Sequence, residues 1–187
     1  MAEEPGLRKN ERTAVFAEGC FWHSELVFQS LVGVREALSG YAGGSDAHPT
    51  YEKVSTGSTG HAEAVKVYYD PSKIRYETLV RVFFASHDPT SLNRQGQDAG
   101  TEYRSIAFYQ TPEEKQIIDA ELARAQAKYK KPIVTEVKPL GRFYPAEELH
   151  QEYVEKHPDN DYVKYVAIPE FLAFKIDFEA NYKPVSY

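Results

Sequence analysis

Residues 13–32 read TAVFAEGCFWHSELVFQSLV. Residues 13–17 form a short apolar run typical of a strand, and Gly19 ends it. The following stretch, residues 20–32, repeats small and apolar side chains on one helical face. That face holds Cys20, Ser24, Val27, Phe28 and Leu31. The pattern predicts a strand that bends at Gly19 into a helix beginning at Cys20.

Strand and helix patterns alternate along the rest of the chain. Strands are expected at residues 34–41, 61–69, 103–109 and 133–140, and helices at residues 76–87, from Pro112 onward and at 145–156. Loops are expected at residues 42–60 and 88–101. Thr111 followed by Glu114 is a capping-box pattern for the helix at Pro112. We therefore predict one α/β (α+β) domain over residues 13–187, after a flexible leader at 1–12 and ending in an aromatic-rich tail from Asp161.

The composition limits the class of protein. The 187 residues carry a formal net charge of −6, which argues against a general nucleic-acid binder. No apolar run reaches the roughly 18–20 residues that would span a membrane, and residues 1–13 lack a signal-peptide core. The single cysteine excludes an intramolecular disulfide and favours a reducing compartment, so we expect a cytoplasmic protein without a membrane or nucleic-acid partner.

Residues 61–69 show the clearest strand alternation. Glu63 shares one face with Val65, Val67 and Tyr69. If that face is buried, Glu63 is desolvated, its pKa rises, and it is a protonated acid near neutral pH. The alternative is an edge-strand carboxylate that faces solvent.

Cys20 is either inert core filler or the reactive atom of the protein. Free cysteines are often buried as small hydrophobic residues. A thiol at a helix N-terminus, however, is expected to have a lowered pKa, because unpaired backbone N–H groups there favour negative charge. Phe21 and Trp22, expected to be exposed at the bend, would form an apolar wall beside the sulfur.

The order Gly19-Cys20-Phe21-Trp22-x-x-Glu25 resembles the active-site signature of the A-type peptide methionine sulfoxide reductases. Five further blocks resemble the same family, in the same order: GYAGG at residues 40–44, PTY at 49–51, TGHAEA at 59–64, HDP at 87–89 and QGQDAGTEYRS at 95–105. The resemblance extends over roughly residues 13–157. An ordered match of so many blocks is highly specific.

The resemblance implies a role for each matching residue. Cys20 would attack the sulfoxide sulfur, become a sulfenic acid and release methionine. Glu63 would protonate the sulfoxide oxygen, with further hydrogen bonds from Tyr51 and Tyr103. Asp98 would polarise the site through water. For each of these three loop residues alone, surface packing or turn formation is the alternative interpretation.

The resemblance also implies the fold and the substrate. The substrate would be the S epimer of methionine sulfoxide, either as the free amino acid or within oxidised proteins. Phe21 and Trp22 would hold its S-methyl group. The implied fold is a two-layer sandwich with a mixed sheet flanked by helices, ferredoxin-like in outline. We expect the protein to act as a monomer.

The chain departs from many relatives because it lacks a second, resolving cysteine. An external thiol must then reduce the oxidised Cys20 directly: thioredoxin, glutaredoxin with glutathione, or a small dithiol. His23, three residues after Cys20, either tunes the thiol or is an ordinary polar residue of the first helical turn.

Two other functions are compatible with a lone cysteine. A cysteine hydrolase would need a histidine base, for which His61 and His150 are candidates. A non-catalytic module could instead bind methionine or its sulfoxide in an aromatic pocket. The spacing of the histidines does not match a metal site, so we expect no bound metal. The sequence has no glycine-rich loop of the phosphate-binding kind, so we expect no nucleotide cofactor.

Overall fold

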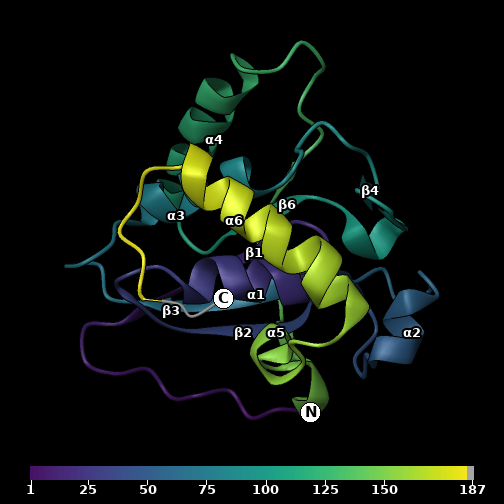
Figure 1. Cartoon of the computed structure of the whole chain (residues 1–187). Helices are drawn as coiled ribbons and strands as arrows, with labels where there is room; N and C mark the ends of the chain where they lie inside the picture. Colours follow the sequence, from purple (N-terminus) through teal and green to yellow (C-terminus); the bar gives the residue numbers. More distant parts are fainter. Residues whose placement is uncertain (185–187) are drawn as a thin grey trace.

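A six-stranded sheet forms the centre of the computed structural model, which describes residues 1–184 (Figure 1). Its strands, in the order β7-β6-β1-β3-β2-β8, are β7 (Glu136–Pro139), β6 (Ile106–Tyr109), β1 (Arg12–Ala17), β3 (Ala62–Tyr69), β2 (Val34–Ala42) and β8 (Tyr144–Pro145). All neighbouring strands are antiparallel except β6 and β7, which are parallel. A separate hairpin joins β4 (Arg94–Gln95) to β5 (Asp98–Ala99).

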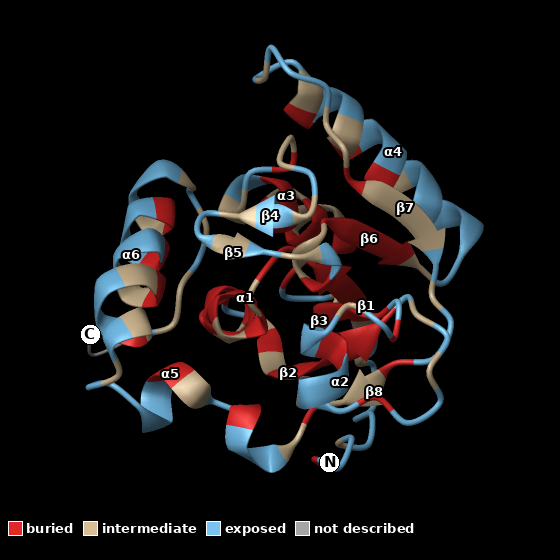
Figure 2. Ribbon diagram, turned by 90° about the vertical axis from the view of Figure 1, so that its right-hand side faces the viewer, coloured by how far each residue is buried: buried red, intermediate tan, exposed pale blue. Residues whose placement is uncertain are grey.

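Helices cover one face of the sheet and mainly coil covers the other. The helices are α1 (Phe21–Gln29), α2 (Tyr51–Ser55), α3 (Tyr76–Ser86), α4 (Pro112–Gln126), α5 (Tyr153–Lys156) and α6 (Ile168–Asp177). The main core lies between the sheet and α1, α3, α4 and α6. Phe143 and Ala2 belong to the second core on the opposite face. Figure 2 shows burial concentrated on the central strands, such as β1, β3 and β6, and on α1. The predicted two-layer α/β (α+β) sandwich, a mixed sheet flanked by helices, is confirmed.

Strand β3 has the alternation that its sequence predicts, and both of its faces are buried. Val65, Val67 and Tyr69 pack into the core on the helical side, whereas Ala64 and Tyr68 pack on the other side. The strand lies between β1 and β2 in the sheet. Glu63 therefore lies on a central strand, and the alternative of an edge-strand carboxylate is wrong.

Several expected elements differ in extent. The helix expected at residues 20–32 covers Phe21–Gln29, with Cys20 as its N-cap. The strands expected at 103–109 and 133–140 begin only at Ile106 and Glu136. The expected loops contain the short helix α2 and the β4–β5 hairpin. Short two- to five-residue elements leave too little periodicity to be read from sequence.

The prediction of one continuous helix over residues 145–156 is wrong, because only Tyr153–Lys156 is α-helical. Only the first residue of this stretch, Pro145, pairs with β2 in β8; a 3₁₀ turn (Glu148–His150) follows, and the helical part is the short α5. Glu152 has φ 53°, a left-handed conformation that interrupts a right-handed helix. The aromatic-rich tail contains a π-helical turn (Val163–Ala167) and α6, and its last residues, 185–187, lie outside the described part of the chain.

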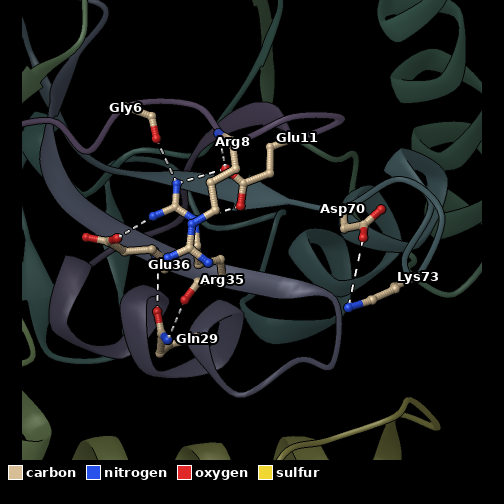
Figure 3. Close-up of polar contacts among 9 residues, drawn as sticks. Gly6, Arg8, Glu11, Gln29, Arg35, Glu36, Asp70 and Lys73 are labelled. Atoms are coloured by element: carbon tan, nitrogen blue, oxygen red, sulfur yellow. Dashed lines mark hydrogen bonds and ion pairs between the residues drawn. The ribbon is translucent and has the colours of Figure 1, made fainter.

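The N-terminal leader contacts the sheet in this structure. Arg35 of β2 donates to Glu11 from Nε (2.6 Å) and Nη2 (2.9 Å), and to the carbonyl of Gly6 (Figure 3). The hydrogen bonds from Arg35 hold the pKa of Glu11 at about 2. The N–H of Ala2 donates to the carbonyl of Ala146. The flexibility of residues 1–12 stays a prediction, which limited proteolysis would measure.

Candidate active site

Cys20 lies at the N-cap of α1, immediately after the turn that follows β1. Gly19 makes this turn with φ +116°, a conformation that side chains rarely adopt. The carbonyl of Cys20 accepts from the N–H groups of His23 (3.1 Å) and Ser24 (3.3 Å), which starts the first helical turn. The thiol of Cys20 is free, and the residue is half-buried. The chain thus presents its only sulfhydryl at a helix N-terminus.

Glu63 reaches the same helix terminus from β3. Its Oε2 accepts a hydrogen bond from the N–H of Phe21 at 3.0 Å, and the residue is 2% exposed. Burial, opposed by the Phe21 hydrogen bond and reinforced by the charges of Asp98 and Glu102, raises the pKa of Glu63 to about 8. Of the two alternatives that the strand pattern left open, the structure has the buried carboxyl, and its raised pKa favours the protonated form near neutral pH.

The thiol of Cys20 does not have the lowered pKa that its position predicts. Burial and the charge of Glu63 raise its pKa well above the ordinary value. A hydrogen bond with the side chain of Tyr162 and one with the backbone of Trp22 act in the lowering direction. The backbone hydrogen bond at the helix terminus lowers the pKa of the thiol, as expected, but desolvation raises this pKa by more.

The three loop residues expected at the site gather around Cys20 and Glu63. Tyr51 is the first residue of α2, Asp98 lies in β5, and Tyr103 ends a 3₁₀ turn (Thr101–Tyr103). Burial and then the charge of Glu63 raise the pKa of Tyr51 to about 12 and raise that of Tyr103. Asp98 and Cys20 raise the pKa of both phenols further, so these groups share one electrostatic environment.

The two aromatic residues after Cys20 have different environments. Phe21 is 1% exposed and stacks on Tyr51 at 6.2 Å, so the expectation that it is exposed is wrong. Trp22 is half-buried. It stacks face to face on Tyr153 at 3.7 Å and meets the ring of Tyr162 edge-on at 5.8 Å. Trp22 is thus held in an aromatic cluster with Tyr153 and Tyr162.

Sequence reasoning missed Tyr153 and Tyr162 as neighbours of the site, and it considered His150 only as a possible hydrolase base. The hydroxyl of Tyr162 donates to Asp98 Oδ2 at 3.2 Å and is also hydrogen-bonded to Cys20. The indole N–H of Trp22 donates to His150 Nδ1 at 3.2 Å. His150 and Tyr153 lie in the stretch 145–156 that was expected to be one helix, and Tyr162 lies in the aromatic-rich tail. The available signal was their chemistry, because a buried tyrosine hydroxyl needs a partner.

A buried polar cluster adjoins the site beneath α1. Glu18 is 2% exposed, accepts a hydrogen bond from Ser86 Oγ at 2.8 Å, and has a pKa raised to about 8 by burial. His23 is 8% exposed rather than a solvated polar residue, and burial lowers its pKa. Its Nδ1 has no partner within the described residues. His23 therefore belongs to the protein interior.

The histidines considered as hydrolase bases have other partners. His61 Nδ1 accepts from the N–H of Gly44 at 3.0 Å, and its Nε2 lies 2.8 Å from the carbonyl of Asp46. His150 bonds Trp22, as described above. Within residues 1–184, no group of three or more His, Cys, Asp or Glu side chains is arranged to hold a metal ion. The same part of the chain holds no helix long and apolar enough to cross a membrane.

Comparisons with known proteins agree on one family. The family described as "Peptide methionine sulfoxide reductase" matches residues 12–181. Peptide methionine sulfoxide reductase MsrA of Pasteurella multocida is 48% identical over 170 residues, covering 91% of this chain and 98% of the relative. The protein of the same name from Thermus thermophilus is 44% identical over 174 residues, covering 93% of this chain and 99% of the relative.

Solved structures are similar as well. Reduced Mxr1 from Saccharomyces cerevisiae has a TM-score of 0.77 and 33% identity, covering 81% of this chain and 88% of Mxr1. Mxr1 in complex with Trx2 has a TM-score of 0.56 and 26% identity, covering 77% and 85%. These structures extend the similarity from sequence to fold.

Proposed function

The chain belongs to the peptide methionine sulfoxide reductase family, and from this premise we propose that Cys20 is its nucleophile and Glu63 its acid. The protein is an oxidoreductase that reduces methionine sulfoxide to methionine. The observation that carries the assignment is the meeting of a thiol and a buried, protonated carboxyl at the N-terminus of α1.

The proposed reaction has two half-reactions. Cys20 Sγ attacks the sulfoxide sulfur and forms an S–S bond, while the S–O bond breaks and the protonated oxygen leaves as water. Water then attacks Cys20 Sγ and the S–S bond breaks, so that the products are methionine and the sulfenic acid of Cys20. An external thiol then attacks the sulfenic sulfur, which releases water and leaves a mixed disulfide, and a second thiol restores Cys20 as the thiol. Two external thiols thus supply the two electrons of each turnover.

Glu63 supplies the proton that the sulfoxide oxygen needs as its bond to sulfur breaks. The carboxyl is protonated up to about pH 8, and the thiol of Cys20 returns one proton per reduction. No net proton is consumed, because the lost thiol proton balances the proton gained by the sulfenic acid. Burial explains how a carboxyl can hold a transferable proton at neutral pH.

The remaining residues bind and orient the substrate in this proposal. Tyr51 and Tyr103 donate hydrogen bonds to the sulfoxide oxygen, and their raised pKa values keep both phenols protonated. Asp98 is joined to the thiol through Tyr162. Phe21 and Trp22 contact the S-methyl group in this proposal, and the preference for the S epimer is what the family resemblance implies.

The external thiol follows from the sequence, because Cys20 is the only cysteine in 187 residues. Thioredoxin, or glutaredoxin with glutathione, fits this requirement, and the similar Mxr1 has been solved in complex with Trx2. We further propose that the protein works as a monomer in the cytoplasm, where such thiols are maintained. Turnover of each sulfoxide epimer with each reductant in turn identifies the partner.

A stoichiometric burst tests the assignment of Cys20. Reduced protein mixed with excess methionine sulfoxide and no reductant is expected to release about one methionine per chain and to trap one sulfenic acid. Cys20→Ser is expected to release none, while circular dichroism shows the same fold. Methionine released by Cys20→Ser would remove the thiol from the mechanism.

Replacing Glu63 tests the acid. Glu63→Gln preserves the size of the side chain but cannot transfer a proton, so we expect the single-turnover rate to fall roughly 10²–10⁴-fold. Glu102→Gln, which removes a neighbouring buried carboxyl, is the matched control and should lose far less. A near-normal rate in Glu63→Gln would mean that another group supplies the proton.

A further inference from the structure

A cavity of about 440 Å³ lies between α3, α4 and α6, away from the Cys20 site. In Figure 1 the C-terminal end of α6 meets α3 and α4 at the upper left of the molecule. None of the lining residues belongs to the site built above. The volume falls within the range of small-molecule pockets, roughly 300–1,000 Å³. The size alone admits a ligand, and the chemistry of the walls indicates which kind.

Aromatic rings form the floor of this cavity. Phe84 and Phe174 are buried, and Phe178 stacks on Phe174 with ring centroids 5.3 Å apart and an interplanar angle of 16°. Phe178 and Tyr129 are only half-buried, so part of their ring surface faces the opening. Such a floor suits a planar, apolar body that can stack on or against the rings.

The walls carry three cationic and two acidic side chains, against a whole chain of net charge −6. The buried carboxylate of Glu121 is already paired with Arg81 Nε at 3.0 Å and lies 3.8 Å from Arg124 Nε. The side chain of Arg124 is nevertheless 62% exposed. Lys128, in the turn that follows the end of α4, also lines the cavity and is exposed. Arg124 and Lys128 therefore leave positive charge exposed at the opening of the cavity, beside the carboxylate of Glu121.

We propose that this cavity binds a small amphipathic anion, with an aromatic body on the phenylalanine floor and a carboxylate or sulfonate at Arg124 and Lys128. The apolar body supplies burial, and the two cations select the charge of the ligand. Asp177 on the opposite wall disfavours an anion there, which fixes the orientation of the ligand. This site is independent of the sulfoxide chemistry.

Fluorescence titration with 8-anilinonaphthalene-1-sulfonate, an aromatic sulfonate, tests the proposal. We expect saturable binding to the wild-type protein. Ala85→Trp should abolish it, because Ala85 is an exposed residue that lines the cavity and a tryptophan there fills the space. Ala123→Trp is the matched control: it is exposed on α4 but does not line the cavity, and it should bind as the wild type.

The charge of the ligand is tested separately. The double variant Arg124→Gln with Lys128→Gln should weaken binding of the sulfonate by about fivefold or more, and should leave binding of the neutral analogue N-phenyl-1-naphthylamine unchanged. Lys130→Gln with Lys131→Gln removes the same charge outside the cavity and should weaken neither. Unfolding midpoints confirm that each variant is folded.

Two outcomes would overturn the proposal. Sulfonate binding that survives in Ala85→Trp would show that the probe binds at another place, for example at the aromatic cluster around Trp22. Equal loss of the charged and the neutral probe in the arginine–lysine variant would show that the two cations do not recognise an anion. Turnover of methionine sulfoxide plays no part in either readout.

Discussion

At the scale of single residues, two effects oppose each other at the Cys20 thiol. The helix terminus and Tyr162 lower its pKa, but burial and Glu63 raise it further. The strand pattern of residues 61–69 placed Glu63 on one face with Val65 and Val67 but left open whether that face is buried, and both faces of β3 are buried in the structure. The helix terminus was not sufficient to predict a lowered thiol pKa, because the degree of desolvation depends on tertiary neighbours such as Tyr162, which are distant in sequence.

The protonation of Glu63 predicts a pH profile. The pKa of this carboxyl is raised to about 8, so the acid form is lost as the pH rises through that value. We expect kcat/KM for methionine sulfoxide to fall above about pH 8, and the slow residual rate of Glu63→Gln to lack this descending limb. Measurement of both profiles over the same buffers, with single-turnover rates, checks the assignment. A limb that persists in Glu63→Gln would belong to another group.

At the scale of elements, long and strongly patterned segments were predictable and short ones were not. The strands β1, β2 and β3 and the helix α3 follow their apolar periodicity to within a few residues. The two-residue strand β8 has no periodicity. It exists because Gly40 and Tyr41 of β2 pair with Pro145 and Tyr144. Pairing with β2 takes only Pro145 out of the helix expected at residues 145–156, and the 3₁₀ turn and the left-handed Glu152 limit the α-helix to α5.

This pairing predicts the effect of a single methyl group. A Cβ at Gly40 would collide with the ring of Phe143 and the carbonyl of Tyr144, so Gly40→Ala must displace β8. We expect a loss of about 1–3 kcal/mol in the free energy of unfolding, measured with urea. Gly141→Ala is the control, because nothing lies within 4 Å of its Cβ, and it should change stability by less than about 0.5 kcal/mol. Equal losses would show that the collision is absorbed without moving β8.

At the scale of the whole molecule, the site joins segments that are far apart in sequence. Cys20, Glu63 and Asp98 come from ordered blocks whose order was visible in the sequence, and the fold brings them to one helix terminus. The tail residue Tyr162 completes the site through Asp98, at a separation of 64 residues. No local pattern encodes that contact, because it depends on how α6 packs over α1. The packing also buries ionisable groups, with a consequence for global stability.

Glu18 provides the test of that consequence. Its pKa is raised by burial from 4.5 to about 8, so the folded state holds a proton that the unfolded state releases. The stabilisation is full below about pH 4.5 and is lost as the pH rises through about 8. Glu18→Gln keeps a neutral side chain at every pH. Relative to this variant, the wild type should lose up to about 1.4 kcal/mol of unfolding free energy per pH unit across that window.

The opposite sign is expected for Glu11, whose pKa Arg35 lowers to about 2. Its contribution is present above about pH 4.5 and is lost as the pH falls toward 2, so Glu11→Gln should differ from the wild type in its pH dependence only on the acid side. Urea unfolding of the wild type and both variants across the two windows separates the effects.

A wild-type advantage over Glu18→Gln that stays constant between pH 4.5 and 8 would mean that Glu18 is ionised inside the fold. His87 Nδ1 lies 3.7 Å from the Glu18 carboxylate, but burial lowers the pKa of His87 to about 4, so this imidazole is neutral over the same pH window and would not balance the charge.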